Sequence, residues 1–268
     1  MLVSLAKPEG YRLDAADGYI GRCADFLIDD ACWVVRWMVA DTGNWLPGRK
    51  VLVSPAQLDT PDWSHHRLPV RLTREQIEAA PPLDDDAPIS RRYEQAFNAF
   101  HGLPHYWLGS NLWGHYPMPS SMLGPREAAD QPVSRVPDNA ALTEPMTTED
   151  EDRIALRSLR EITGYGVLAK PGDADTPATE RVGRVDDLII DERTWAVRYI
   201  VVDRSWLPLS KHVLLPVELV RDLDWTTQRL HAAATEQQVK DAPSVEHGEP
   251  VTDLLATQTD AHYGRPQA

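Results

Sequence analysis

The feature that most restricts the possible fold is an internal repeat. Residues 21–41, "GRCADFLIDDACWVVRWMVAD", match residues 183–203, "GRVDDLIIDERTWAVRYIVVD", at ten of 21 positions without a gap. The similarity continues from "NWLPGRKVLVSPAQL" (44–58) to "SWLPLSKHVLLPVEL" (205–219), so that each copy covers about sixty residues. A unit this short buries little surface, and each copy therefore needs flanking segments or its twin to complete a core.

Each copy begins with the pattern of a β-hairpin. Residues 22–29 and 33–40 are rich in Val, Ile, Trp and Phe, and they flank a polar cluster that is typical of a loop. The alternation along the strands puts Trp33 on a core face in the first copy and Trp195 on a core face in the second. A capping box near the end of each copy predicts a short helix, with Thr73 and Gln76 in one and Thr235 and Gln238 in the other.

A charged pair recurs in the two predicted hairpins. Counting outward from each loop places Asp25 opposite Arg36, and Asp187 opposite Arg198. Opposite charges that face each other across strands contribute roughly 0.2–1 kcal/mol. We therefore interpret both pairs as structural salt bridges that fix the strand register, and not as catalytic couples.

The second copy carries the pattern "GRVDDLIID…W.VRYIVVD…K.VLLP" after "SLREITGYGV" at 158–167, and the first copy follows "GYRL" at 10–13. In these motifs the chain resembles the PRC-barrel domain family. The resemblance implies a mainly β fold with two small antiparallel barrels related by internal pseudo-symmetry, and with short helices at the repeat ends and in the connector. Relatives such as the cytoplasmic domain of a photosynthetic reaction-centre protein and the C-terminal domain of a ribosome maturation factor have accessory, protein-binding roles.

The repeat also predicts the domain organisation. We expect a first PRC-barrel-like repeat at 1–81, a connector at 82–150, a second repeat at 151–243 and a polar tail at 244–268 that frays. Within the connector, an aromatic segment at 91–121 precedes a polar and acidic linker.

Composition excludes some classes of partner. The formal charge is −14, from 41 acidic and 27 basic residues, so the mean field repels a phosphate backbone and disfavours nucleic acid. The longest apolar stretch, "CWVVRWMVA", is short and contains Arg36, and we therefore expect neither a signal peptide nor an integral membrane span. The two cysteines, Cys23 and Cys32, have no counterparts in the second copy, which favours free thiols and a cytoplasmic location.

Four common functional motifs are not found in the sequence. It contains no glycine-rich phosphate loop, no paired-cysteine motif, no "HExxH" and no "GxSxG" elbow. We therefore predict a non-enzymatic protein with no catalytic residue, no metal and no cofactor.

The connector provides the candidate interaction surface. Disordered linkers are poor in aromatic residues, whereas this one must bury many of them, either on its own barrels or against another chain. The candidate residues are Tyr93, Phe97, Phe100, His105, Tyr106, Trp107, Trp113, His115 and Tyr116. Because Pro104 interrupts the helical spacing between His101 and His105, a metal site in the connector is not favoured.

The sequence thus predicts a non-enzymatic interaction or scaffold module with an unknown protein partner. We expect a homo-oligomer in which the connector is the main contact surface, and the alternative is that the connector folds back to cap an open barrel end. The alternative function is an enzyme, or a redox accessory protein linked to a metal or a quinone, that uses the histidines and tryptophans of the connector.

Overall fold

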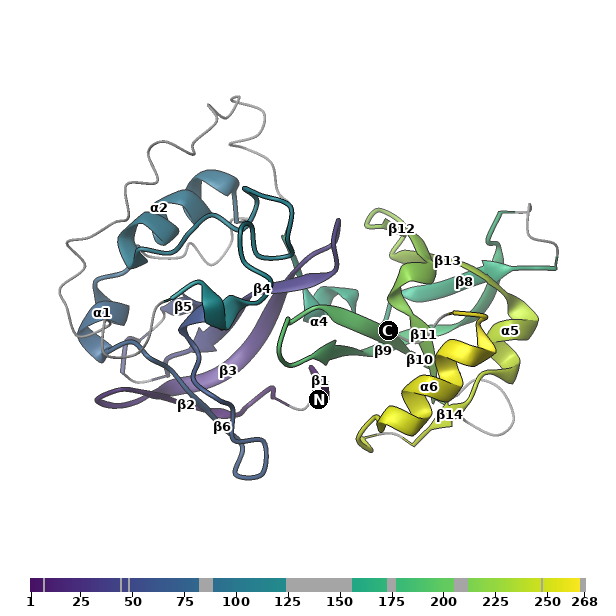
Figure 1. Ribbon diagram of the computed structural model, residues 1–268, viewed down its shortest axis with the longest axis horizontal. Coiled ribbons are helices and arrows are strands. Elements are labelled where there is room, and N and C mark those ends of the chain that lie inside the picture. The colour runs from purple at the N-terminus through teal and green to yellow at the C-terminus, as the bar shows by residue number, and fades with distance from the viewer. Residues whose placement is uncertain are drawn as a thin grey trace. The chain divides into compact units, whose positions relative to one another are not determined.

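The protein is mainly β and divides into two compact units. The computed structural model describes residues 1–6, 8–43, 45–47, 49–81, 89–123, 156–172, 177–204, 212–246 and 248–265. The C-terminal unit consists of Met1–Lys7, Ser158–Glu192 and Ala196–Ala268, and the N-terminal unit of Pro8–Arg157 and Arg193–Trp195. Each unit is built on one sheet (Figure 1). The predicted acidic linker lies outside the described residues from position 124 onward.

The C-terminal unit contains an eight-stranded sheet. Its strands, in spatial order, are β12 (Val220–Asp224), β13 (Arg229–Thr235), β8 (Gly166–Lys170), β9 (Glu180–Asp191), β10 (Val197–Asp203), β11 (His212–Pro216) and β14 (Ser244–Val245), with β1 (Leu2–Ser4) paired to β9. The pairing of β13 with β8 is parallel, and the other pairings are antiparallel. The helical elements of this unit are α4 (Leu159–Ile162), η5 (Val217–Leu219), α5 (Glu236–Asp241) and α6 (Asp253–His262).

The N-terminal unit contains a six-stranded sheet. Its strands, in spatial order, are β5 (Lys50–Val53), β4 (Val34–Asp41), β3 (Gly18–Asp29), β2 (Arg12–Ala15) and β6 (Arg67–Pro69), with β7 (Leu156–Ser158) paired to β3. The helical elements of this unit are η1 (Pro55–Gln57), α1 (Arg74–Glu78), α2 (Arg91–His101) and η2 (Pro119–Ser121). None of the helices in the described part of the chain has the length and apolar character needed to cross a membrane.

A glycine allows the two strands of each long hairpin to come very close. A Cβ atom on Gly183 of β9 would lie 2.5 Å from the carbonyl oxygen of Asp203 at the end of β10. On Gly21 of β3 it would lie 2.1 Å from the carbonyl oxygen of Asp41. Contacts this short leave no space for a side chain, because both neighbours are backbone atoms of a paired strand.

Bulges in both hairpins shift the register away from the predicted one. Asp25 lies opposite Val39, and Asp187 lies opposite Val201. The register shifts at Arg36 in β4 and again at Arg198 in β10, so that each arginine is the extra residue of a bulge. The predicted pairs Asp25–Arg36 and Asp187–Arg198 are therefore wrong, because counting from the loop assumes an uninterrupted ladder.

Arg36 is instead buried and has other partners. Its side chain is 3% exposed, and its Nη2 lies 3.5 Å from Oδ2 of Asp29. Its Nη1 donates a hydrogen bond to the carbonyl oxygen of Leu112. The guanidinium also lies 3.9 Å from the ring centroid of Tyr106 and 5.0 Å from that of Trp113. Arg36 therefore joins the hairpin to the folded connector.

The tryptophans at the loop ends adopt an unusual backbone conformation. Trp33 has φ 55° and Trp195 has φ 59°, both in the left-handed region that side chains other than glycine seldom adopt. Trp195 is buried, whereas Trp33 is only half-buried. The two predicted capping boxes are confirmed, at Thr73 in front of α1 and at Thr235 in front of α5.

The stretch expected to be a polar tail is folded in its described residues, 244–246 and 248–265. It contains β14 and α6, and Val245 and Val251 pack with Ile189 and Val201 in the core of the sheet. Tyr199 donates a hydrogen bond of 3.0 Å to Oδ1 of Asp260 in α6. Composition alone suggested fraying, but a few apolar side chains at the right spacing are enough to hold the helix on the sheet.

Gly183→Ala is expected to destabilise the protein by roughly 1–3 kcal/mol, because the new methyl group would overlap the end of β10. Gly172→Ala is the matched control, since a Cβ there meets nothing within 4 Å, and its effect should stay within about 0.5 kcal/mol. Urea denaturation of both variants measures the difference. Equal midpoints for the two variants would contradict the close crossing.

Arg36→Ala is expected to cost roughly 3–5 kcal/mol, because it leaves the Asp29 carboxylate largely buried without its ion-pair partner. Arg198→Ala, at the corresponding bulge of the other hairpin, should cost at most about 1 kcal/mol because that side chain is only half-buried. Denaturant midpoints check the order. A larger loss for Arg198→Ala would show that the bulge, and not the buried partners, determines the cost.

Candidate functional site

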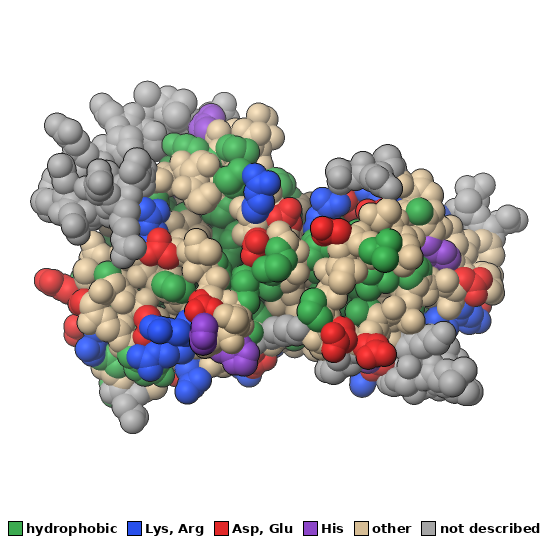
Figure 2. Space-filling view, turned by 60° about the horizontal axis from the view of Figure 1, so that its bottom comes forward, with side chains coloured by type: hydrophobic (Ala, Val, Ile, Leu, Met, Phe, Trp, Pro, Cys, Tyr) green, Lys and Arg blue, Asp and Glu red, His purple; other side chains and the backbone are tan. Residues whose placement is uncertain are grey.

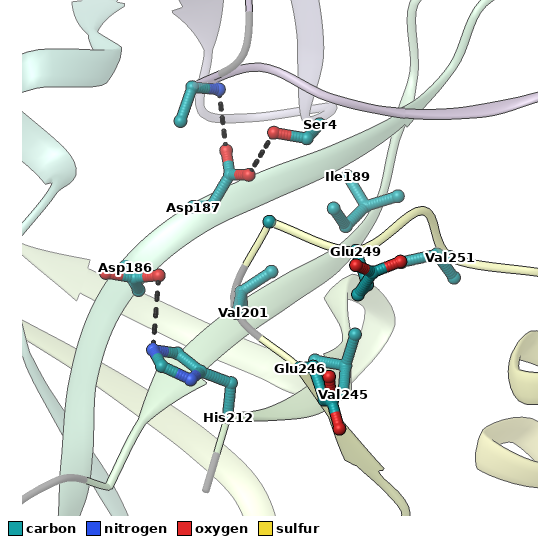
Figure 3. Close-up of a pocket in the computed structure, with 12 residues that line it drawn as sticks. Ser4, Asp186, Asp187, Ile189, Val201, His212, Val245, Glu246, Glu249 and Val251 are labelled. Atoms are coloured by element: carbon teal, nitrogen blue, oxygen red, sulfur yellow. Dashed lines mark hydrogen bonds and ion pairs between the residues drawn. The ribbon is translucent and has the colours of Figure 1, made fainter.

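The C-terminal unit has a cavity of about 210 Å³ beside β9 (Figure 3). Four carboxylates line it: Asp186 and Asp187 of β9, and Glu246 and Glu249 of the segment after β14. Apolar side chains of the strands, including Ile189 and Val201, form another part of the wall, together with Val251. The cavity thus combines negative charge with an apolar surface.

A bulge explains why two consecutive acidic residues reach one cavity. Successive side chains of a regular strand point to opposite faces of the sheet. In β9, however, Asp187 pairs with Val201 and Val185 pairs with Val202, which leaves Asp186 as the extra residue. Both carboxylates consequently line the cavity. In β3 the corresponding bulge residue is Ala24, so the N-terminal unit lacks this second carboxylate.

Asp187 holds the N-terminal segment against β9. Its carboxylate accepts hydrogen bonds from the Ser4 hydroxyl, from the Ala6 amide at 2.9 Å and from the Leu188 amide at 2.7 Å. Burial raises the pKa of the Asp187 carboxyl, and these three hydrogen bonds act in the opposite direction. Figure 3 shows Asp187 turned toward Ser4, with Asp186 turned toward His212.

His212 lies between two aspartates at one end of the cavity. Its Nε2 is 3.5 Å from Oδ2 of Asp186 and 3.8 Å from Oδ1 of Asp203. The other oxygen of Asp203 accepts hydrogen bonds from Arg184, with Nη2 at 2.8 Å. Among the described residues, Asp186, Asp203 and His212 form a group whose ligand atoms lie within 4.8 Å of one another. Imidazole and carboxylate are common ligands of divalent metals, so this group could hold an ion.

The arrangement suits a cationic ligand with an aliphatic part. Glu246 and Glu249 are exposed at the opening, while Asp187 is buried deeper. A lysine side chain has the matching properties, because its ammonium group prefers carboxylates and its stem prefers apolar contacts. The cavity therefore has the chemistry of a pocket for a basic side chain.

The predicted interaction residues lie in the N-terminal unit, where a buried glutamate organises them. Glu94 of α2 is 1% exposed and accepts hydrogen bonds from Trp37 Nε1 at 2.8 Å and from the Tyr106 hydroxyl at 2.7 Å. Arg91 completes the group with an ion pair of 3.0 Å to Oε2 of Glu94. These contacts fix α2 and the following loop on β4, since Trp37 belongs to that strand.

Burial removes part of the predicted contact surface. Phe97 and Trp113 are 1% exposed and Tyr106 is 5% exposed, all within the N-terminal unit. These three side chains pack inside their own unit and are not a surface for another chain. The remaining candidates are more accessible: Tyr93, His105, Trp107 and Tyr116 are half-buried, and Phe100 and His115 are exposed.

The described connector histidines are not arranged as a metal site. His101 packs on Phe97 at 4.4 Å, and His105 stacks on Trp107 at 4.6 Å. Within the described ranges, no group of three potential metal ligands includes His101, His105 or His115. The one group found contains His212, which had no role among the sequence-based candidates.

Comparison with known proteins identifies one domain. Residues 157–239 match the PRC-barrel domain family. The chain therefore contains a PRC-barrel domain in this region, which confirms the predicted resemblance for the second repeat. No curated protein matches the chain. The matched region contains Asp186, Asp187, Asp203 and His212, so the strand side of the acidic cavity belongs to the PRC-barrel domain.

From the sequence, Asp187 was predicted only as a partner of Arg198, and the cavity was not predicted. One sequence feature does point to the cavity, because the second copy has "VDDL" where the first has "CADF". The added acidic residue distinguishes the copies at the position of the bulge. Glu246 and Glu249 had no comparable signal, since they lie in a polar stretch beyond the repeat.

His101→Phe is expected to reduce the loss of stability in acid. Burial lowers the pKa of His101 to about 4, whereas the pKa of a histidine in the unfolded chain is about 6.5. As the pH falls, the unfolded chain therefore binds a proton at this histidine before the folded protein does. The stability that neutral His101 contributes is complete above pH about 6.5 and is lost as the pH falls toward about 4. Urea unfolding at several pH values measures the slope, with the exposed His115→Phe as control. Equal slopes for His101→Phe and the wild type would contradict a half-buried His101 that is neutral in the folded protein.

Proposed function

We propose that the protein is a non-enzymatic interaction module built from two PRC-type barrels related by internal pseudo-symmetry. The observation that carries this proposal is the PRC-barrel domain at 157–239, a domain that suggests a protein-interaction module in general. The acidic cavity beside β9 lies partly within that region and is the proposed docking place of a basic segment of the partner.

Several features of the N-terminal unit support a second PRC-type copy there. Left-handed backbone occurs at Trp33 and His66, and again at the same spacing at Trp195 and Gln228. The glycine crossings and the capping boxes are also repeated. The ring of Tyr11 lies 6.3 Å from that of Trp63, and the ring of Tyr165 lies 5.8 Å from that of Trp225. These turns and ring contacts depend on the path of the backbone. Their repetition therefore supports the same fold in the N-terminal and the C-terminal unit.

The charge of the molecule favours a basic partner over a nucleic acid. The formal charge is −14, and on the face shown in Figure 2 acidic and basic side chains are interspersed among hydrophobic and uncharged ones. A carboxylate pocket in a net negative protein attracts a cationic segment and repels phosphate. The proposed partner is therefore a protein with an exposed lysine-rich or arginine-rich stretch.

A charge-matched pair of variants tests the proposal. The double variant Glu246→Gln, Glu249→Gln removes two carboxylates of the cavity, and the control Glu180→Gln, Asp222→Asn removes two exposed carboxylates outside it. The wild type and both variants, each carrying a tag, are used to capture partners from cells that produce the protein. Quantitative mass spectrometry then identifies proteins whose captured amount falls at least about fivefold with the cavity variant but not with the control. Calorimetry with a lysine-rich peptide provides the direct measurement.

Two results would contradict the proposal. If both variants bind the lysine-rich peptide equally at matched salt, the cavity is not the docking place. If the wild type captures no protein above background but converts a small molecule, the protein is not an interaction module.

A metal-linked accessory role is the second candidate function, and one observation favours it. The distances of 3.5 Å and 3.8 Å from His212 to its two aspartates are longer than a good hydrogen bond. They are close to the separation of about 3.3 Å between two ligands of a tetrahedral zinc ion. Metal analysis of the purified protein distinguishes the candidates: stoichiometric metal that is lost in His212→Ala but kept in His231→Ala would favour this role.

A further inference from the structure

The N-terminal strand is a distant segment bound to the C-terminal unit as an added edge. Leu2, Val3 and Ser4 of β1 pair with Asp191, Ile190 and Ile189 of β9. The pairing continues through a hydrogen bond of 2.9 Å from the Leu5 amide to the carbonyl oxygen of Leu188. Ser4 and Asp187 are 183 positions apart in the sequence. Addition of a strand to a sheet in this way is a common mode of peptide recognition.

The side chains of the segment are recognised individually. Val3 is 8% exposed and Leu5 is 1% exposed, so both are buried. Between and after them, the Ser4 hydroxyl and the Ala6 amide both donate to the carboxylate of Asp187. The edge thus selects an apolar residue, a small hydroxyl residue and a second apolar residue, in that order, while exposed Ala6 contributes only its backbone amide.

The segment is joined to the rest of its unit only through the N-terminal unit. The chain passes from Lys7 to Pro8 and does not return to the C-terminal unit until Ser158. With respect to β9, residues 1–6 therefore act as a tethered ligand, which competes with free ligands through its effective concentration.

We propose that β9 forms an exchangeable docking edge, and that residues 1–6 of a second copy of this chain are its intermolecular occupant. The chain's own segment shows that this sequence fits the edge. A second copy makes the same hydrogen bonds and buries the same side chains, so exchange loses no contact. This docking edge adjoins the proposed site of the basic partner and shares Asp187, Ser4 and Ala6 with its lining, but it depends on backbone pairing and on the Ser4 hydroxyl, and not on the charge of Glu246 and Glu249.

A variant of the full chain whose residues 1–6 no longer occupy the edge of β9 tests the proposal. Leu5→Asp places a charge at a buried position next to β1 and is expected to release the segment without changing β9. A fluorescent peptide with the sequence of residues 1–6 should then bind at least about tenfold more tightly to Leu5→Asp than to the wild type, measured by anisotropy. Adding Asp187→Ala should weaken that binding at least about tenfold, whereas adding Asp222→Ala, at an exposed position outside the cavity, should leave it unchanged.

Several outcomes would overturn the proposal. A folded Leu5→Asp variant that fails to bind the peptide, or binding that ignores Asp187→Ala, shows that β9 is not a docking edge. If Leu5→Asp loses its β circular-dichroism spectrum, hydrogen exchange of the wild type replaces it: excess peptide should expose the Leu5 amide, and unchanged protection rejects the exchange. Light scattering decides the occupant, because a concentrated wild type that stays monomeric rejects the second copy.

These tests are independent of the function proposed above. The peptide of residues 1–6 carries no basic side chain, and the charge-matched variants do not alter β1 or Asp187. Failure of the lysine-rich peptide to bind would therefore leave the strand exchange intact, and failure of the strand exchange would leave the basic partner intact.

Discussion

The close crossing of two strands at a glycine is the constraint on which both sheets depend. A side chain at Gly183 or Gly21 would collide with the backbone of the paired strand, at distances of 2.5 Å and 2.1 Å. Because glycine has no side chain, the two strands of each long hairpin stay paired up to their open end, where Asp203 lies opposite Arg184 and Asp41 lies opposite Arg22. The strand register starts at this crossing, and the bulges at Ala24 and Asp186 follow it along the hairpins.

One backbone plan then supports different chemistry in the two units. The bulge of β3 holds Ala24, whereas the bulge of β9 holds Asp186. Opposite the last aspartate of the hairpin lies Lys50 in one sheet and His212 in the other. A lysine offers an ammonium group, while a histidine offers an imidazole that can bind a metal. Substitutions at these two positions therefore supply Asp186 and His212 to the strand side of the acidic cavity.

Two buried carboxylates attach distant segments to these sheets. Asp187 binds residues 1–6 through Ser4 and Ala6, and Glu94 binds Trp37 of β4 from helix α2. A buried carboxylate is costly unless donors surround it, so each one is stable only when its segment is in place. Apolar burial alone would tolerate many positions of the segment. The carboxylates select one position, because only that position supplies all the donors.

The sequence by itself determined the elements that depend on neighbouring residues, and tertiary packing decided the rest. Runs of Val, Ile and Trp predicted the hairpins, and the capping box at Thr73 predicted α1. The mainly β class is confirmed. Register was not predictable by counting, because a bulge such as that at Arg36 is a compromise between two paired strands. The same limit applies to the connector and the cavity. Whether an aromatic side chain is buried depends on the distant segments that pack against it. The same holds for carboxylates that meet from separate segments, so a local sequence pattern predicts neither.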